Sequence, residues 1–294
     1  MRGQFALAAC AVLTTVFVTL SGASALAAPI PMPKLQQSLD IQQHYRNALR
    51  GEEVIELSTD TERFIALSLQ QRTATPQGGL LILHDVGHTP NWPFLLQQAR
   101  EYLPDVGWNT LAIDLPTPAR DAVGVLPLDD TDTASAQTPQ QTPDERVLAR
   151  IRAGLARLNS LGDFNIVILG FGDGGYWGAR YLAENLTEAE QDGYGLILVE
   201  APGQYPDLDG FIGELPIPML DLYMTDSDYA HRRAKERKAS AARAENEDYQ
   251  QIHDALRQST YGKPSIDRTT RRIWGWLREN AAGGEAQLEE QTLY

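Results

Sequence analysis

Short apolar runs alternate with segments of helical periodicity along most of the chain, and this alternation restricts the fold more than any other feature. Residues 80–83 form a continuous apolar run, which is typical of a strand that is buried on both faces. Strands that alternate with helices predict a mostly parallel sheet covered by helices. We expect strands at residues 54–57, 64–69, 80–83, 110–113, 166–169, 196–199, 219–223 and 249–254, and helices at 35–49, 94–103, 145–161, 176–185, about 231–247 and 267–279.

The sequence therefore predicts an α/β fold, with a doubly wound, mostly parallel sheet of about eight strands, an antiparallel first pair and helices on both faces. One domain at residues 28–280 would hold all these elements. Residues 117–141 are rich in Thr, Asp, Pro and Gln and lack a periodic apolar face. They predict a flexible surface excursion, which is either a lid over the site or plain disorder. Residues 281–294 predict an acidic tail.

The helix expected at 145–161 has well-marked ends. Thr142 precedes Pro143, and Glu145 follows three residues after Thr142, which is the pattern of a capping box. Gly162 predicts the end of the helix. Its apolar face would consist of Val147, Leu148, Ile151, Leu155 and Leu158.

The N-terminus has the three parts of a secretory signal peptide. Arg2 supplies a positive charge, residues 6–20 are mostly apolar, and small residues lead to Ala27. This order predicts cleavage after Ala27. The mature bacterial protein, residue 28 onward, would then be periplasmic or secreted, with no membrane span. The alternatives are an uncleaved anchor, although a spanning helix needs roughly 20 apolar residues, and a lipid on Cys10, which only nine residues precede.

Composition and charge exclude several functions. Cys10 is the only cysteine, so its removal with the signal peptide leaves no disulfide, no cysteine-bound zinc and no thiol nucleophile. The formal charge of −14 disfavours nucleic acid and anionic lipid as partners. The basic segment 231–238 is a local exception. It predicts a solvated surface helix or, alternatively, a docking face for an anionic partner.

A glycine-dense turn joins the strand expected at 166–169 to the helix that follows, and it reads Gly-Phe-Gly-Asp-Gly-Gly from residue 170 to residue 175. Gly170, Gly174 and Gly175 allow the strand and the helix to approach closely around such a turn. The stretch resembles the G-x-S-x-G nucleophile elbow of the α/β-hydrolase superfamily. Gly172 lies at the position of the nucleophile.

The resemblance extends over most of the chain after residue 27. His84 and Asp85 match the His-Gly segment after the third strand, with Asp85 in place of the glycine, and the resemblance implies a structural role for His84. Residues 108–116 match the next strand, and residues 218–228 match the strand whose end carries the triad acid. In detail the chain is similar to a family of exported bacterial α/β-hydrolase-like proteins of unknown function.

The resemblance implies a catalytic triad, whose members can be compared with this chain one by one. Gly172 has no side chain that could attack a substrate, so the nucleophile is absent. Asp226 or Asp228 fills the place of the acid. The base should follow the last strand, where residues 255–264 contain no histidine. His253 is the nearest one, and we expect it to be structural.

Two carboxylates argue further against serine chemistry. Hydrolases of this superfamily bind the developing oxyanion with backbone N–H groups, one after the nucleophile and one in the loop after the third strand. In this chain those neighbourhoods carry Asp173 and Asp85. Their negative charges would oppose an oxyanion in a partly dry cleft.

Other chemistry at this edge of the sheet stays open. Asp173 lies one residue past the nucleophile position and could be the nucleophile of a non-serine hydrolase, with Asp228 and with or without His253. Metal binding is a second alternative, although the spacing of the residues fits no defined zinc pattern. The metal-ligand types at the cleft edge are His84, Asp85, His88 and Asp173.

These features predict an exported α/β-hydrolase-like protein without serine catalysis, which acts as a binding or scaffolding module in the periplasm. Its partner would be a small molecule or an envelope protein. We expect no cofactor and no metal. The alternatives are the non-serine hydrolase, which leaves enzymatic activity open, and a structural envelope protein.

Overall fold

The computed structural model describes residues 33–51, 53–93, 95–116, 141–255 and 266–281. Contacts divide the chain into two compact units, Met1–Ile41 and Gln42–Tyr294, and the boundary falls inside α1 (Pro33–Ala48). The account below concerns the second unit. The predicted signal peptide, the start of the predicted domain, nearly all of the predicted excursion and nearly all of the predicted tail lie outside the described residues.

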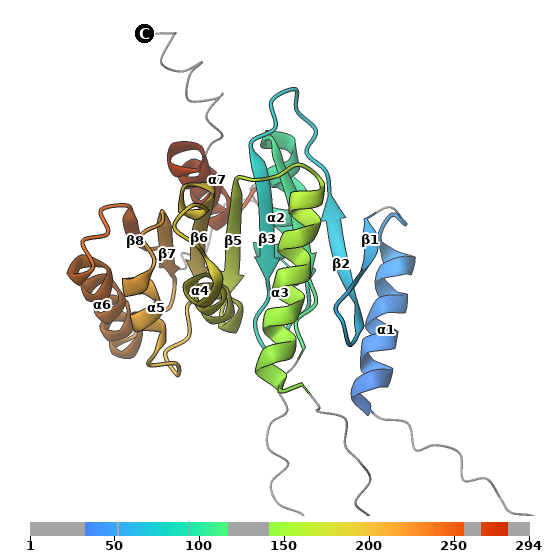
Figure 1. Cartoon of the computed structure of the whole chain (residues 1–294), viewed down its shortest axis with the longest axis horizontal. Coiled ribbons are helices and arrows are strands. Elements are labelled where there is room, and N and C mark those ends of the chain that lie inside the picture. Colours follow the sequence, from blue (N-terminus) through green and yellow to red (C-terminus); the bar gives the residue numbers. More distant parts are fainter. Residues whose placement is uncertain (1–32, 52, 94, 117–140, 256–265, 282–294) are drawn as a thin grey trace, which may run out of the picture. The chain divides into compact units, whose positions relative to one another are not determined.

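One eight-stranded sheet runs through the second unit in the order β1-β2-β4-β3-β5-β6-β7-β8 (Figure 1). The β1–β2 and β2–β4 pairs are antiparallel and the other pairs are parallel. The predicted sheet is thereby confirmed. The strands are β1 (Val54–Ser58), β2 (Arg63–Leu69), β3 (Gly78–Leu83), β4 (Trp108–Ile113), β5 (Ile166–Phe171), β6 (Tyr194–Val199), β7 (Met219–Tyr223) and β8 (Tyr249–His253).

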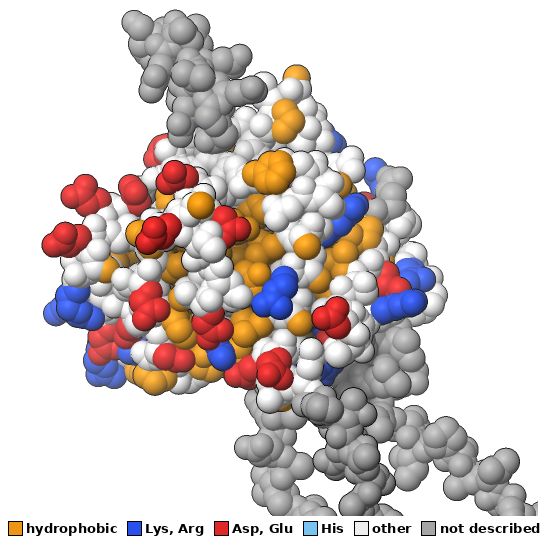
Figure 2. All heavy atoms as spheres, viewed as in Figure 1, with side chains coloured by type: hydrophobic (Ala, Val, Ile, Leu, Met, Phe, Trp, Pro, Cys, Tyr) orange, Lys and Arg blue, Asp and Glu red, His pale blue; other side chains and the backbone are white. Residues whose placement is uncertain are grey.

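Helices cover both faces of the sheet, as the sequence predicts. In Figure 1, α3 and α4 lie on the near face, whereas α2 and α7 lie together behind the sheet. In Figure 2, acidic side chains are spread over the near face with basic side chains between them. No helix among the described residues is long and apolar enough to cross a membrane. The helices are α2 (Leu95–Tyr102), α3 (Pro143–Ser160), α4 (Asp173–Asn185), α5 (Leu208–Glu214), α6 (Asp228–Arg243) and α7 (Arg268–Asn280).

The core lies between the sheet and these helices. Every residue of β3 is buried, which confirms the expected doubly buried strand. The predicted capping box of α3 is present, because the Thr142 side chain accepts the N–H of Glu145 and the Glu145 side chain accepts the N–H of Thr142. Of the five residues expected on its buried face, four are buried and Leu148 is partly buried.

Two helix predictions need correction, and one helix was not expected. The helix expected at about 231–247 is α6, which begins at Asp228 because the Ser227 hydroxyl accepts the N–H of Ala230. The helix expected from residue 176 is α4, which begins at Asp173, directly after the glycine turn. The short helix α5 was not expected, since it spans only seven residues and gives little periodic signal.

A buried ion pair corrects the interpretation of the basic segment 231–238. Arg237 is 2% exposed and binds both carboxylate oxygens of Asp221 in β7, at 2.8 and 3.1 Å. Tyr249 and Gln251 of β8 donate to the same carboxylate, each at 2.7 Å. Burial and the Asp221 charge raise the pKa of Tyr249, so it stays protonated. The polar sequence of β8 therefore serves this network, and α6 is not a fully solvated helix.

Candidate functional site

The glycine turn at the end of β5 has the geometry of a nucleophile elbow. Gly172 has φ 56° and ψ −127° and directly precedes α4, a conformation that residues with a side chain rarely adopt. A Cβ atom on Gly170 or on Gly174 would lie under 3.0 Å from the backbone of Gly175 or Leu83, respectively. The backbones of β5 and α4 are therefore in close contact at these glycines. The turn predicted from the sequence is present, with Gly172 at its tip.

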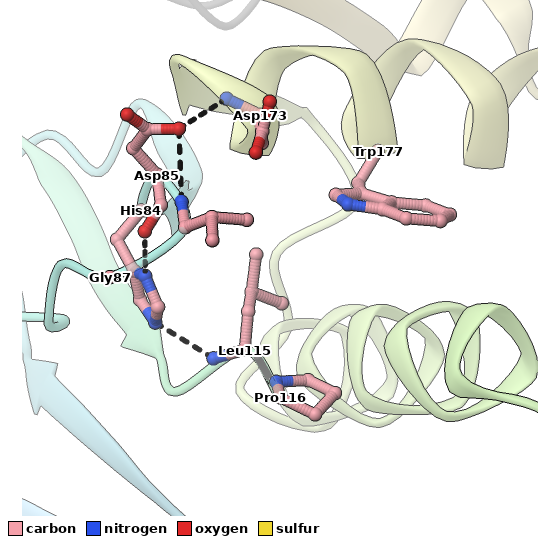
Figure 3. Close-up of a pocket in the computed structure, with 8 residues that line it drawn as sticks. His84, Asp85, Gly87, Leu115, Pro116, Asp173 and Trp177 are labelled. Carbon is pink, nitrogen blue, oxygen red and sulfur yellow. Dashed lines mark hydrogen bonds between the residues drawn. The ribbon is translucent and has the colours of Figure 1, made fainter. Parts of the chain in front are cut away.

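The carboxylate of Asp85 accepts two backbone hydrogen bonds at this elbow (Figure 3). Its Oδ1 accepts the N–H of Asp173 at 2.8 Å and the N–H of Val86 at 2.9 Å. These are the N–H that follows the nucleophile position and an N–H of the loop after β3, which together form the oxyanion hole of serine hydrolases of this fold. Sequence reasoning predicted that Asp85 would repel an oxyanion, whereas the structure places its carboxylate on the donors themselves.

Asp85 also fills the space that a side chain at residue 172 would need. A Cβ atom built on Gly172 would lie under 3.0 Å from Cγ and from both carboxylate oxygens of Asp85. Real Cβ atoms do not come this close to other heavy atoms. A serine at 172 and the observed position of Asp85 therefore exclude each other.

Asp173 is buried beside Asp85, with 7% of its surface exposed. Gln204 donates to its Oδ1 at 2.9 Å. Burial, followed by the negative charge of Asp85, raises the pKa of Asp173 to about 6, against a smaller lowering by a hydrogen bond from Tyr205. The closeness of the two carboxylates that the sequence predicts is thus present.

The two histidines near the elbow have packing roles. His84 accepts the N–H of Leu115 at Nε2 and donates from Nδ1 to the backbone oxygen of Asp85, both at 2.8 Å. Both nitrogens are engaged, so His84 cannot bind a metal in this arrangement. The His88 ring stacks on Trp92 at 3.7 Å between centroids, and its Nδ1 lies 3.7 Å from Oδ2 of Asp85, beyond hydrogen-bond distance.

The cavity at the elbow is small. Its volume is about 10 Å³, which is close to the minimum for one water molecule. An acyl group does not fit beside the described residues without their rearrangement. The cavity is lined by His84, Asp85, Val86, Gly87, Leu115, Pro116, Asp173 and Trp177.

The expected acid and base positions lie at the other end of the sheet. Asp228 is exposed and begins α6. Asp226 lies in the loop before it, and its Oδ1 is 2.9 Å from Nε2 of His231, a hydrogen bond that lowers the pKa of Asp226. His253 is exposed at the end of β8, where its ring stacks on Tyr223 with centroids 4.6 Å apart. The structure thus brings His253 together with Asp226 and His231.

The elbow and His253 do not meet. Two strands, β6 and β7, separate β5 from β8. Neighbouring strands are about 4.8 Å apart, so the two strand ends are separated by roughly 14 Å. The expected trio of Asp173, Asp228 and His253 is therefore not assembled. Sequence reasoning did not assign His231 to a site, because the residues around it are basic and polar. The one available signal is that His231 lies in the first turn after the N-cap Ser227, close to Asp226.

The model of a family described as "Protein of unknown function (DUF3530)" matches residues 6–279. The chain belongs to the DUF3530 family. No curated protein matches this DUF3530 protein.

Solved structures similar to this DUF3530 protein include hydrolases. A dienelactone hydrolase from Anabaena variabilis has a TM-score of 0.52 and 15% identity, over 78% of this chain and 97% of that chain. An esterase from Pyrococcus furiosus has a TM-score of 0.53 and 12% identity, over 78% of this chain and 92% of that chain. Est1E from Butyrivibrio proteoclasticus has a TM-score of 0.52 and 13% identity, over 77% of this chain and 98% of that chain. At these identities the likeness establishes the α/β-hydrolase fold, and this confirms the resemblance found in the sequence.

Proposed function

We propose that this protein is an exported member of the α/β-hydrolase fold that has lost catalysis and acts as a binding module in the periplasm. Its partner is a small molecule or an envelope protein. Fold alone does not decide function, so the proposal rests on the site.

The position of Asp85 is the observation that carries the proposal. A serine hydrolase needs a nucleophile and free N–H donors for the oxyanion. In this chain the nucleophile position is Gly172, and the Asp85 carboxylate holds the N–H groups of Asp173 and Val86. Because that carboxylate also fills the space of a side chain at 172, the loss of serine chemistry does not depend on one substitution.

A second cavity supports a binding role. It has a volume of about 220 Å³ and lies at the ends of β6 and β7 beside α6. Glu200 forms one wall with a φ of 51°, and its side chain accepts the N–H groups of Met224 and Thr225 and the Thr225 hydroxyl. Backbone strain of this kind persists where surrounding contacts fix it, and it is frequent at binding sites. Drug-sized ligands occupy roughly 300–1,000 Å³, so this cavity fits a smaller molecule.

Activity-based labelling tests the loss of serine catalysis. We expect no labelling of the purified protein by a fluorophosphonate probe, because residue 172 has no hydroxyl and the oxyanion donors are taken. A catalytically competent esterase of the same fold is the positive control. A labelled serine in the native protein would overturn the proposal.

A hydrolase centred on Asp173 is the second candidate. The pKa of this carboxyl, raised to about 6, favours a general acid or base at neutral pH. However, Asp228 and His253 are at the far strands, so Asp173 would have to act with the groups around the elbow. A broad screen with ester, epoxide and halide substrates decides between the two. Turnover that Asp173→Asn abolishes would establish the enzyme and refute the degenerate site.

The proposed export has its own test. We expect the protein in the periplasmic fraction to begin at Ala28, since the small residues before it follow an apolar segment. Intact-mass measurement of that fraction reads the N-terminus directly. A species that retains residues 1–27 would contradict the cleavage.

A further inference from the structure

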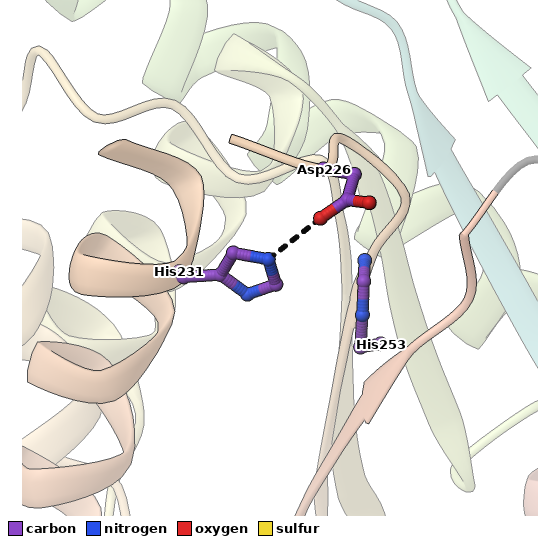
Figure 4. A group of neighbouring side chains, drawn as sticks. All are labelled: Asp226, His231 and His253. Atoms are coloured by element: carbon purple, nitrogen blue, oxygen red, sulfur yellow. Dashed lines mark hydrogen bonds and ion pairs between the residues drawn. The ribbon is translucent and has the colours of Figure 1, made fainter. Parts of the chain in front are cut away.

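Three metal-ligand side chains converge at the corner where β7, α6 and β8 meet, and we refer to Asp226, His231 and His253 as the corner cluster (Figure 4). Each residue offers one ligand atom, and these atoms all lie within 4.8 Å of one another. The Asp226 and His231 atoms are already 2.9 Å apart. Within the described part of the chain, the corner cluster is the one group of three or more histidine and carboxylate side chains that is spaced closely enough to hold a metal ion.

The three ligands come from three different backbone elements. Asp226 lies in the loop after β7, His231 in the first turn of α6, and His253 at the end of β8. Ser227 caps α6 between the first two and fixes the entry of the helix. Tyr223 of β7 is directly opposite His253 in the parallel register. The backbone positions of His231 and His253 are therefore set by regular structure, and Asp226 directly precedes the capped start of α6.

Tyr223 also orients both imidazole rings. Its ring stacks on His253 with centroids 4.6 Å apart and an interplanar angle of 13°. Its hydroxyl lies 3.4 Å from Nδ1 of His231, which leaves Nε2 of that ring facing Asp226. A metal-binding histidine commonly has its second nitrogen held by a polar partner in this way. The two histidine rings meet nearly at right angles, at 81°, with centroids 4.8 Å apart.

We propose that the corner cluster is a three-ligand site for Zn²⁺, with a fourth position open to water or to a ligand group. Two imidazoles and a carboxylate form a donor set typical of zinc sites that keep an open position. Zinc bond lengths of about 2.0–2.2 Å place tetrahedral ligand atoms roughly 3.4 Å apart. Small torsional adjustments of the three side chains within their present rotamers cover the difference from the present spacing.

A surface ion pair between Asp226 and His231 would explain only part of the corner cluster, whereas a zinc site explains the position of His253 as well. A pair needs Asp226 and His231 alone, whereas the His253 ring is also held against Tyr223 beside the same carboxylate. The corner also adjoins the cavity of about 220 Å³, because Tyr223, Thr225 and Ser227 line it. A metal at the corner would thus lie next to a space where a small ligand fits. The zinc site does not depend on whether the elbow is inactive.

Calorimetric titration with ZnCl₂ tests the site in the purified, untagged protein. We expect one Zn²⁺ per chain and a loss of affinity of at least about tenfold in each of the variants D226N, H231Q and H253Q. H44Q is the matched control, since His44 is an exposed histidine of α1 outside the cluster, and it should bind zinc as the native protein does. Ca²⁺ should not compete, because it prefers oxygen ligands.

A second measurement needs no variant. Co²⁺ in place of Zn²⁺ should give the intense visible absorption of a four-coordinate site, and ZnCl₂ should abolish that absorption. The Y223F variant keeps the stacking on His253 but removes the hydroxyl near His231, so we expect weaker zinc binding with the same stoichiometry. Absence of saturable Zn²⁺ binding, or equal affinity in the native protein and the three cluster variants, would overturn the proposal.

Discussion

The elbow after β5 and the corner cluster lie at the same edge of the sheet but differ in how their polar groups are satisfied. At the elbow, the carboxylate of Asp85 pairs with the N–H groups of Asp173 and Val86, and both nitrogens of His84 are engaged. The cavity there is about 10 Å³. At the corner, Asp226 and His253 are exposed beside a cavity of about 220 Å³.

This contrast shows that the position that carries catalysis in the α/β-hydrolase fold differs, in this chain, from the position where we propose that a ligand binds. At the elbow, the backbone N–H groups that would bind an oxyanion are already hydrogen-bonded to Asp85. The groups that remain open to solvent are at the end of the sheet, above the buried ion pair of Asp221 and Arg237. Predictions about stability should therefore differ between the two regions.

The largest effect is expected below the corner. Arg237→Ala removes the partner of Asp221, which is 0% exposed, and breaking a buried ion pair in this way costs about 3–5 kcal/mol. Urea denaturation measures the change. Arg232→Ala is the matched control, because this arginine lies on the exposed side of the same helix, and it should change the free energy of unfolding by less than about 1 kcal/mol. Equal effects of the two variants would contradict the structural role of Arg237.

The second effect is expected at the elbow tip. Gly172→Ser should destabilise the protein by about 2–4 kcal/mol, because the backbone strain adds to the displacement of Asp85 from its two N–H donors. Gly87→Ser is the control for strain alone, since Gly87 has φ 81° and open space around it. Neither variant should hydrolyse a nitrophenyl ester. Gly87→Ser leaves residue 172 without a hydroxyl, and in Gly172→Ser the negative charges of Asp85 and Asp173 stay beside the place of the oxyanion.

A double-mutant cycle sharpens the same prediction. In Asp85→Gly/Gly172→Ser the collision is gone, so the two changes together should cost less than their sum by at least about 1 kcal/mol. Thermal or urea unfolding of the four proteins measures this coupling. Additive costs would show that Asp85 does not occupy the space beside residue 172. Robust esterase activity of Gly172→Ser alone would show that a base and a free oxyanion hole are present after all.

The smallest effect concerns Asp173. Its folded pKa of about 6 lies above the usual value of 3.8, so the ionised form costs stability as pH rises through this interval, and the cost is absent below it. Asp173→Asn keeps an acceptor for Gln204 and should raise stability by about 1–3 kcal/mol at pH 7.5 and by nothing at pH 4. Thermal midpoints at both pH values measure it, with the exposed Asp192→Asn as control. A variant less stable than the native protein at pH 7.5 would refute the repulsion between Asp173 and Asp85.

The sequence predicts the sheet and the elbow well, because both depend on local patterns. A short apolar run such as β3 is compatible with few structures, and so is a set of glycines at fixed spacing. Gly170, Gly172 and Gly174 accordingly occupy the expected turn. The capping box of α3 is equally local. The seven residues of α5 carry too short a pattern to be recognised.

The site depends on side-chain placement, which the sequence does not contain. Asp85 could be assigned to the oxyanion region from its position after β3, but its rotamer decides whether it repels an oxyanion or replaces it. The corner cluster needs His231 and His253, which are far apart in the sequence and are brought together by the β7–β8 pairing. From the sequence, Arg237 belongs to a basic helix exposed to solvent, and only the structure shows that it pairs with the buried Asp221 of β7.

The overlap between Asp85 and a side chain at residue 172 restricts the order in which substitutions can accumulate. A carboxylate in its present position requires a glycine at 172 first. Once it is in place, a serine introduced at 172 collides with it, and a glycine introduced at 85 leaves an elbow with nothing to attack a substrate. Serine chemistry at this elbow would therefore need at least both substitutions, and neither one alone brings any part of it into use.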